Sequence, residues 1–256
     1  MRKKVILVLF GVILLLASDN DLLNEFLSRD GVKVYDVFNN VTKISIKPYA
    51  KVTDNDLILL SRIPDLSRVS IVNNNITDRS LIYISQLKNV KWLTIKSKKF
   101  KDTKSKHFIK MNKISNLYLD QTNITDSTLM YLGKMNQLEC LSLIETNVTN
   151  KGLKYISTLK NIKVIYLSNT KITDEGLKYL CDFEKLEAID ISNNNITNKG
   201  LEYIAQIKGL QHNEKNRGRD FSAEVYLSGT KVTKKAVEAC EKKLFADIYW
   251  DGNVNR

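Results

Sequence analysis

The sequence has few of the residues on which metal sites, disulfide frameworks and most catalytic sites depend. Its 256 residues include 3 cysteines and 2 histidines. Three cysteines are too few, and too odd in number, for a disulfide framework. Two histidines, His107 and His212, leave little room for a histidine-based metal site or a catalytic triad. We therefore expect a protein that is not an enzyme and that uses no cofactor and no metal.

Proline and glycine are also scarce, with 2 prolines and 10 glycines in the chain. This scarcity predicts short, regular connections rather than long loops. A composition of 43% hydrophobic and 27% charged residues excludes a disordered, collagen-like or multi-span membrane protein. What the sequence has in excess is positive charge, with a formal net charge of +12. That excess favours acidic partners without identifying them.

Residues 1–18 differ in composition from the rest of the chain. Basic residues at positions 2–4 precede a run from Val5 to Ala17 that has no polar side chain. This pattern is typical of a signal peptide and predicts a secreted or periplasmic protein. As a helix the run would span about 20 Å, short of the ~30 Å bilayer core. Cleavage near residue 18 would leave a leucine where a small residue is expected, so an uncleaved membrane anchor stays an alternative.

A 24-residue repeat organises the remaining sequence. Its units open on a triplet of the type Ile-Thr-Asp, and these triplets begin at Val52, Ile76, Ile124, Val148, Ile172 and Ile196, with Phe100 in phase. After each triplet, apolar residues recur every three positions and then every two, which is typical of a short helix followed by a strand. A single unit could not bury its apolar stripe, so we predict that the units stack into one elongated domain.

Two polar positions of each unit have predicted structural roles. The third triplet residue stands where a helix N-cap belongs, as Asp174 does. The position after each strand carries a short polar side chain that can hydrogen-bond the turning backbone of the neighbouring coil. These turn residues are Asn74, Thr122, Thr146, Thr170, Asn194 and Thr230.

The units resemble leucine-rich repeats. The resemblance rests on patterns such as Leu138-x-x-Leu141-x-Leu143-x-x-Thr146-x-Val148. The Ile-Thr-Asp-Glu-Gly-Leu of residues 172–177 is similar to the 24-residue bacterial, GALA-like subclass. The resemblance implies an α/β fold, a right-handed leucine-rich repeat solenoid or horseshoe with parallel strands on the concave face and short helices on the convex face. It also implies a non-catalytic protein that recognises other proteins.

The ends of the chain and one insertion depart from the repeat. We predict an N-terminal cap at residues 19–40, with a short helix from Asp21 to Leu27, repeats at residues 41–231, and a C-terminal capping repeat at residues 232–256. An insertion at residues 211–224 interrupts one unit. It is either part of the binding side, where solenoid insertions often lie, or a tolerated surface loop.

The side chains that flank the buried strand positions predict a binding surface on the concave face. They include rigid aromatic residues of the kind that dominate protein interfaces. The predicted protein-binding residues are Arg68, Trp92, Tyr118, Tyr166, Asp190 and Tyr226, with Arg217 and Arg219 from the insertion. The alternative is that the aromatic rings only cover neighbouring strands. Cys140 falls on the same surface, where it could form an intermolecular disulfide if exposed.

A lysine-rich stretch supports a second hypothesis. Ten lysines and one acidic residue, Asp102, lie between Lys88 and Lys113. The candidate anion-binding residues are Lys96, Lys98, Lys99, Lys101, Lys104 and Lys106. Through them the chain could be a cell-envelope structural or adhesive protein that binds anionic lipid or polysaccharide. Nucleic acid is a less favoured partner because lysine lacks the bidentate phosphate geometry of arginine, and such a cluster can also be an ordinary solvated surface.

Overall fold

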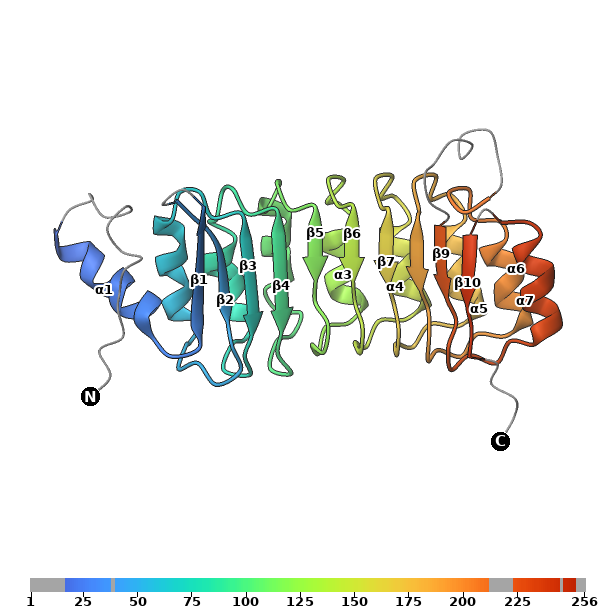
Figure 1. The fold of residues 1–256 in the computed structure, drawn as a ribbon, viewed down its shortest axis with the longest axis horizontal. Coiled ribbons are helices and arrows are strands. Elements are labelled where there is room, and N and C mark those ends of the chain that lie inside the picture. Colours follow the sequence, from blue (N-terminus) through green and yellow to red (C-terminus); the bar gives the residue numbers. More distant parts are fainter. Residues whose placement is uncertain (1–16, 38–39, 212–222, 245, 252–256) are drawn as a thin grey trace.

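The structure, a computed structural model, describes residues 17–37, 40–211, 223–244 and 246–251. They form one ten-stranded sheet in which the strands follow one another in chain order, with short helices on one side only (Figure 1). Neighbouring strands from β2 to β10 are parallel, and β1 pairs with β2 in the antiparallel direction. The predicted stack of strand and helix units is therefore confirmed.

The strands are β1 (Val32–Val37), β2 (Asn40–Ile46), β3 (Arg68–Val72), β4 (Trp92–Lys96), β5 (Asn116–Tyr118), β6 (Cys140–Ser142), β7 (Val164–Tyr166), β8 (Ala188–Asp190), β9 (Ala223–Tyr226) and β10 (Ala246–Tyr249). The α-helices are α1 (Ala17–Ser28), α2 (Leu81–Ile84), α3 (Asp126–Leu132), α4 (Asn150–Ile156), α5 (Asp174–Leu177), α6 (Asn198–Ile204) and α7 (Lys234–Glu241). The 3₁₀ helices are η1 (Asn55–Arg62), η2 (Asp78–Ser80), η3 (Ser105–Lys110) and η4 (Lys178–Leu180).

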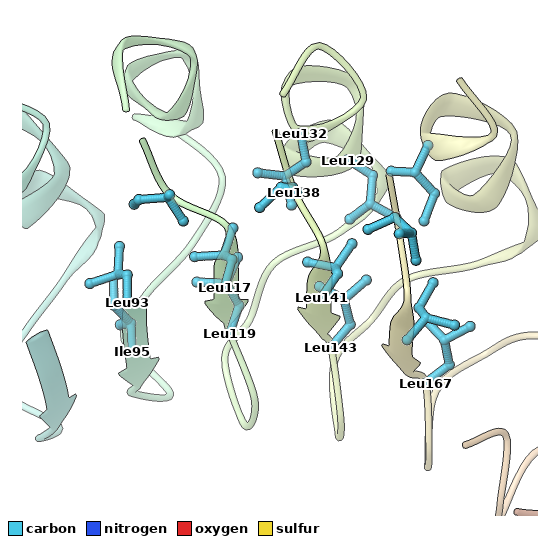
Figure 2. Close-up of a cluster of buried hydrophobic side chains, with 14 of the residues drawn as sticks. Leu93, Ile95, Leu117, Leu119, Leu129, Leu132, Leu138, Leu141, Leu143 and Leu167 are labelled. Atoms are coloured by element: carbon cyan, nitrogen blue, oxygen red, sulfur yellow. The ribbon is translucent and has the colours of Figure 1, made fainter. Parts of the chain in front are cut away.

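The core is a continuous layer of aliphatic side chains between the sheet and the helices (Figure 2). Leu117, Leu141 and Ile165 are paired on successive strands, and each is fully buried. The 24-residue period produces this alignment because it returns the same side chain to the same place in every coil. A row of aliphatic side chains stacked in this way removes apolar surface that one unit alone would leave in water.

The side of the sheet that faces away from the helices is uncovered along the described strands (Figure 1). The sheet is open and uncurled, and we refer to this side as the open face. The open face is the surface predicted from the sequence as the concave face.

The predicted helix caps need a correction. Asp54 is the N-cap residue of η1, without a capping hydrogen bond from its side chain, but in α3, α4, α5 and α6 the N-cap is the threonine before the aspartate or asparagine. Thr149, for example, accepts a hydrogen bond from the backbone N–H of Lys151 through its side chain. The neighbouring carboxylate acts across coils instead: Asp126 accepts the backbone N–H of Thr149 at 2.8 Å and its hydroxyl at 2.7 Å. The aspartate lies in the first turn of its own helix. From there its carboxylate reaches the threonine that precedes the equivalent helix of the next coil.

This contact recurs along the solenoid, and we call it the Asp–Thr ladder. Its rungs run from Asp54 to Thr77, Asp102 to Thr125, Asp126 to Thr149, Asn150 to Thr173, Asp174 to Thr197 and Asn198 to Thr233. The ladder explains the glycine of the Ile-Thr-Asp-x-Gly-Leu pattern. A Cβ on Gly176 would lie 2.4 Å from Oδ1 of Asn150, so a side chain in this unit would have to displace the side chain of Asn150.

The turns after the strands also follow the repeat. Thr122, Thr146 and Thr230 each donate their hydroxyl to the backbone carbonyl three residues earlier, so they bond the turning backbone of their own coil and not of the neighbouring one. In the first turn Asn74 has the predicted role, because its Oδ1 accepts the backbone N–H of Lys98 in the next coil at 3.1 Å. Asn73 beside it is buried, and its side chain donates to the carbonyls of Lys47 and Ala50 in the preceding coil.

Each end of the sheet has its own elements. The predicted helix at residues 21–27 is present within α1, which buries Phe26 completely. The antiparallel strand β1, which the sequence analysis did not predict, covers the N-terminal edge. At the other end α7 buries Val237 and Cys240. Within the described ranges, no helix is long and apolar enough to cross a membrane.

Two predicted segments fall partly outside the described residues. The signal segment, residues 1–18, is described only from residue 17, where α1 begins. The insertion is described at its two ends. Its predicted C-terminal boundary at residue 224 is wrong, because Ala223 and Glu224 already belong to β9.

Candidate protein-binding surface

Two rows of side chains run along the open face, and strand pairing defines them. The first row contains Lys43, Arg68, Trp92, Asn116, Cys140, Val164, Ala188, Glu224 and Asp247. The second row contains Ser45, Ser70, Thr94, Tyr118, Ser142, Tyr166, Asp190, Tyr226 and Tyr249. The structure thus places the six predicted strand residues on one face, in the register that the repeat predicts.

Aromatic and cationic side chains stack on β3, β4 and β5. The rings of Trp92 and Tyr118 lie with centroids 5.3 Å apart and planes at 13°. The guanidinium carbon of Arg68 lies 4.8 Å from the centre of the Trp92 ring, on the strand before it. Stacked rings and a cation above a ring hold each other in place. The side chains in this part of the open face are therefore held in a fixed arrangement.

The middle of the open face is covered by tyrosine rings. Tyr118 and Tyr166 are half-buried, and Cys140 lies at 6% exposure with its thiol donating to the Tyr118 hydroxyl at 3.3 Å. Burial raises the pKa of both phenols and of the Cys140 thiol. The expectation of an exposed Cys140 that forms an intermolecular disulfide is wrong, because burial keeps this thiol protonated and covered.

A second aromatic pair lies at the C-terminal end of the open face. Tyr226 and Tyr249 stack with centroids 4.6 Å apart and planes at 12°. The Tyr226 hydroxyl donates to Glu224 at 2.9 Å, and this bond raises the pKa of Tyr226 to about 12. Asp190 lies beside Tyr226 in the second row and is half-buried.

Two further tyrosines, Tyr35 and Tyr249, lie on this surface and were not predicted from the repeat. Tyr35 on β1 is 43% exposed and faces Lys43, whose ammonium lies 4.6 Å from its ring centre. Tyr249 on β10 is 44% exposed. The 24-residue period could not have found Tyr249, because Tyr249 pairs with Tyr226 after 23 residues, one short of the repeat. Arg217 and Arg219 lie outside the described residues, so their predicted role stays a prediction.

The lysine-rich stretch is not brought together on one surface. Lys96 lies at the end of β4 on the open face, 3.3 Å from the buried carboxylate of Asp120. Lys98, Lys99 and Lys101 are exposed in the connection that follows β4. Lys104 and Lys106 lie on the helix side around η3. Burial lowers the pKa of His107 on this helix, and the nearby positive charges of Lys110, Lys106 and Lys104 lower it further.

Lys98 also lines a polar hollow along the edge where the strands end. Its volume is about 320 Å³, and its other walls are Asn123, Glu145, Thr146, Asn147, Asn169, Thr170 and Lys171. The stretch between Lys88 and Lys113 therefore surrounds one coil. Of the six candidate anion-binding lysines, Lys98 alone lines this hollow.

No group of three or more metal-ligating side chains occurs among the described residues. The free cysteines Cys140, Cys181 and Cys240 lie in different coils, and His107 is on the helix side. His212 lies outside the described residues.

Comparisons with known proteins agree with this geometry. The family described as "Leucine Rich repeat" matches residues 158–181 and 184–205. No curated protein matches the sequence. An internalin C2 from Listeria monocytogenes is similar in structure, with a TM-score of 0.60, 18% identity, and coverage of 81% of this chain and 80% of that one.

An internalin, InlF, from the same organism has a TM-score of 0.58 and 20% identity. The alignment covers 85% of this chain and 55% of that one, so this protein spans about half the length of that relative. At these identities the likeness concerns the fold. Two segments of the chain, residues 158–181 and 184–205, thus match leucine-rich repeats, and the fold of the chain is a leucine-rich repeat solenoid.

Proposed function

We propose that this chain is a non-catalytic, exported leucine-rich repeat protein that binds another protein through the open face of its sheet. One observation carries the proposal: the open face presents half-exposed aromatic and charged side chains at both ends, and they differ from strand to strand. Large, rigid, amphipathic rings of this kind supply most of the binding energy in protein interfaces. The proposed binding residues are Arg68, Trp92, Tyr118, Tyr166, Asp190 and Tyr226.

The remaining parts of the proposal come from the sequence. The N-terminal segment supports export to the periplasm or the exterior. The 24-residue period supports the GALA-like subclass of leucine-rich repeats, and the breaks in the period support caps at residues 19–40 and 232–256.

The test is capture of a partner from an extract of the source cells at low and high salt. The triple variant Tyr118→Ala/Tyr166→Ala/Tyr226→Ala should retain at least about 10-fold less partner than the unchanged protein, because each ring is a candidate interface anchor. The matched control is Ile109→Ala/Met130→Ala, which removes two exposed apolar side chains from η3 and α3 on the helix side. Circular dichroism checks that each variant is folded.

Equal capture by the triple variant and the unchanged protein would overturn the open face as the binding site. Capture that ignores the tyrosines but disappears at high salt would favour the lysine-rich stretch. In that case Lys99→Glu/Lys101→Glu and vesicles of anionic lipid would decide for the adhesive alternative.

A further inference from the structure

Charge on the open face is divided between its two ends. The described part of β1–β4 contributes three cations to the two rows: Lys43 and Arg68 from the first row, and Lys33, which pairs with Ser45 of the second row. Strands β7–β10 contribute the carboxylates Asp190, Glu224 and Asp247. Among the described residues of these rows, carboxylates are absent from β1–β4 and cations are absent from β7–β10.

The middle of the open face separates these two regions. In both rows, β5 and β6 carry uncharged residues: Asn116 and Tyr118, then Cys140 and Ser142. The two charged regions are therefore distinct ends of one surface.

Two of the three cations at the N-terminal end, Lys43 and Arg68, rest on aromatic rings and not on carboxylates. Lys43 lies over Tyr35 at 4.6 Å and Arg68 over Trp92 at 4.8 Å. Neither forms an ion pair within the described part of the chain. A ring on one side orients a cation but does not neutralise it, so the charge remains available to a carboxylate on the other side.

We propose that two copies of this chain associate through their open faces, with the N-terminal end of one over the C-terminal end of the other. The proposal rests on the proposed function, because it takes the same face to be the binding surface. With ten strands in order, a two-fold axis parallel to the strands between β5 and β6 places β2 over β9 and β3 over β8. Lys43 of one protomer then faces Glu224 of its partner, and Arg68 lies near the partner's Asp190.

Charge selects this arrangement over the other face-to-face dimer. A two-fold axis along the length of the sheet would place β2 over β2 and β9 over β9. Cations would then face cations and carboxylates would face carboxylates, which costs several kcal/mol in an interface. The antiparallel arrangement is isologous, so the same surface patch serves both copies.

The open face is large enough for such an interface. Ten strands at a spacing of ~4.8 Å give a length of about 45 Å, and strands of three to seven residues give a width of about 10–20 Å. The area is therefore about 600 Å² per copy, or about 1,200 Å² in total, at the lower end of the range for specific interfaces. A contact of this size that depends on charge should be weak and sensitive to salt.

The test is sedimentation equilibrium of the full chain across the micromolar range. A dimer should form at low salt and dissociate at high salt. Variant Lys43→Glu/Arg68→Glu, with two negative ends, and variant Asp190→Lys/Glu224→Lys, with two positive ends, should each raise the dissociation constant by more than about 100-fold. An equimolar mixture of the two variants should restore the dimer, because each negative end then meets a positive one.

The control is Lys151→Glu/Lys154→Glu, which makes the same charge change on the exposed side of α4 and should leave the dimer intact. The proposal is overturned if the protein is monomeric at every salt concentration, if either reversed variant still dimerises, or if the mixture stays monomeric. A monomer that still captures another protein through its tyrosines would overturn the dimer and leave the proposed function standing. If mixing the two variants restores the dimer but the triple tyrosine variant captures as much partner as the unchanged protein, the dimer stands and the proposed function is overturned.

Discussion

The helix side and the open face of this solenoid use the same repeat in opposite ways. On the helix side, the Asp–Thr ladder repeats nearly the same contact, from Asp54–Thr77 to Asp174–Thr197. On the open face, equivalent positions hold residues as different as Trp92 and Glu224. Repetition marks the side chains that hold one coil on the next. Variation marks the side chains that stacking leaves free for binding.

The sharpest way to break this comparison is to change two neighbours on one strand. Leu93 is fully buried, while Trp92 beside it is half-buried on the open face. Leu93→Ala should cost about 2–5 kcal/mol in the free energy of unfolding, because it leaves a cavity in the core. Trp92→Ala should cost about 1 kcal/mol, chiefly from the lost stack on Tyr118. Urea unfolding measures both, and equal costs would mean that the two sides do not differ.

The Asp–Thr ladder gives the next largest effect and a control within the chain. Asp126→Ala removes the acceptor for the backbone N–H and the hydroxyl of Thr149, and should cost about 1–3 kcal/mol. Asp126→Asn should cost much less, because the next rung already uses an amide. There Asn150 accepts the N–H of Thr173 at 2.9 Å and donates to its hydroxyl at 2.8 Å. Thermal unfolding compares the two, and an equal loss would show that charge and not geometry holds the ladder.

The open face should have a smaller contribution that depends on alkaline pH. The Tyr226–Glu224 hydrogen bond raises the pKa of Tyr226 from 10.0 to about 12, so the folded chain holds this proton more tightly than the unfolded chain. Its stabilisation is complete below pH about 10 and is lost as the pH rises to about 12. Tyr226→Phe should reduce this loss. Urea unfolding at several pH values measures it, and an identical pH profile would contradict the assignment.

The periodicity of the sequence is sufficient to predict what each coil does by itself. It places Leu117, Leu141 and Ile165 in the core, and it places Trp92 and Tyr118 on the outer rows, because spacing within a unit decides which way a side chain points. These features need no knowledge of the neighbouring coil. The fold and most of the candidate binding surface follow from them.

Features that depend on contact between coils could not be predicted in the same way. Thr149 and Asn150 are adjacent polar residues, and only the next coil shows which one caps the helix. Cys140 is buried because Tyr118 extends from another strand to cover it. The lysine-rich stretch is continuous in sequence, yet it passes around one coil from Lys96 on the open face to Lys106 on the helix side.

The smallest predicted effect has the opposite sign and tests the helix side alone. Ser80 and Thr128 occupy the glycine position of their units, and both are fully buried. The Thr128 hydroxyl donates to Asp102 at 2.6 Å, whereas the Ser80 hydroxyl has no hydrogen-bond partner among the described residues. Thr128→Ala should therefore destabilise the chain by about 1 kcal/mol, and Ser80→Ala should stabilise it by up to about 1 kcal/mol, because a buried hydroxyl without a partner carries an uncompensated desolvation cost. Opposite shifts in the urea midpoint would show that the hydrogen bond of the hydroxyl, and not its place in the repeat, decides the effect on stability. A loss in both variants would mean that packing at this position, and not the hydroxyl, sets the stability.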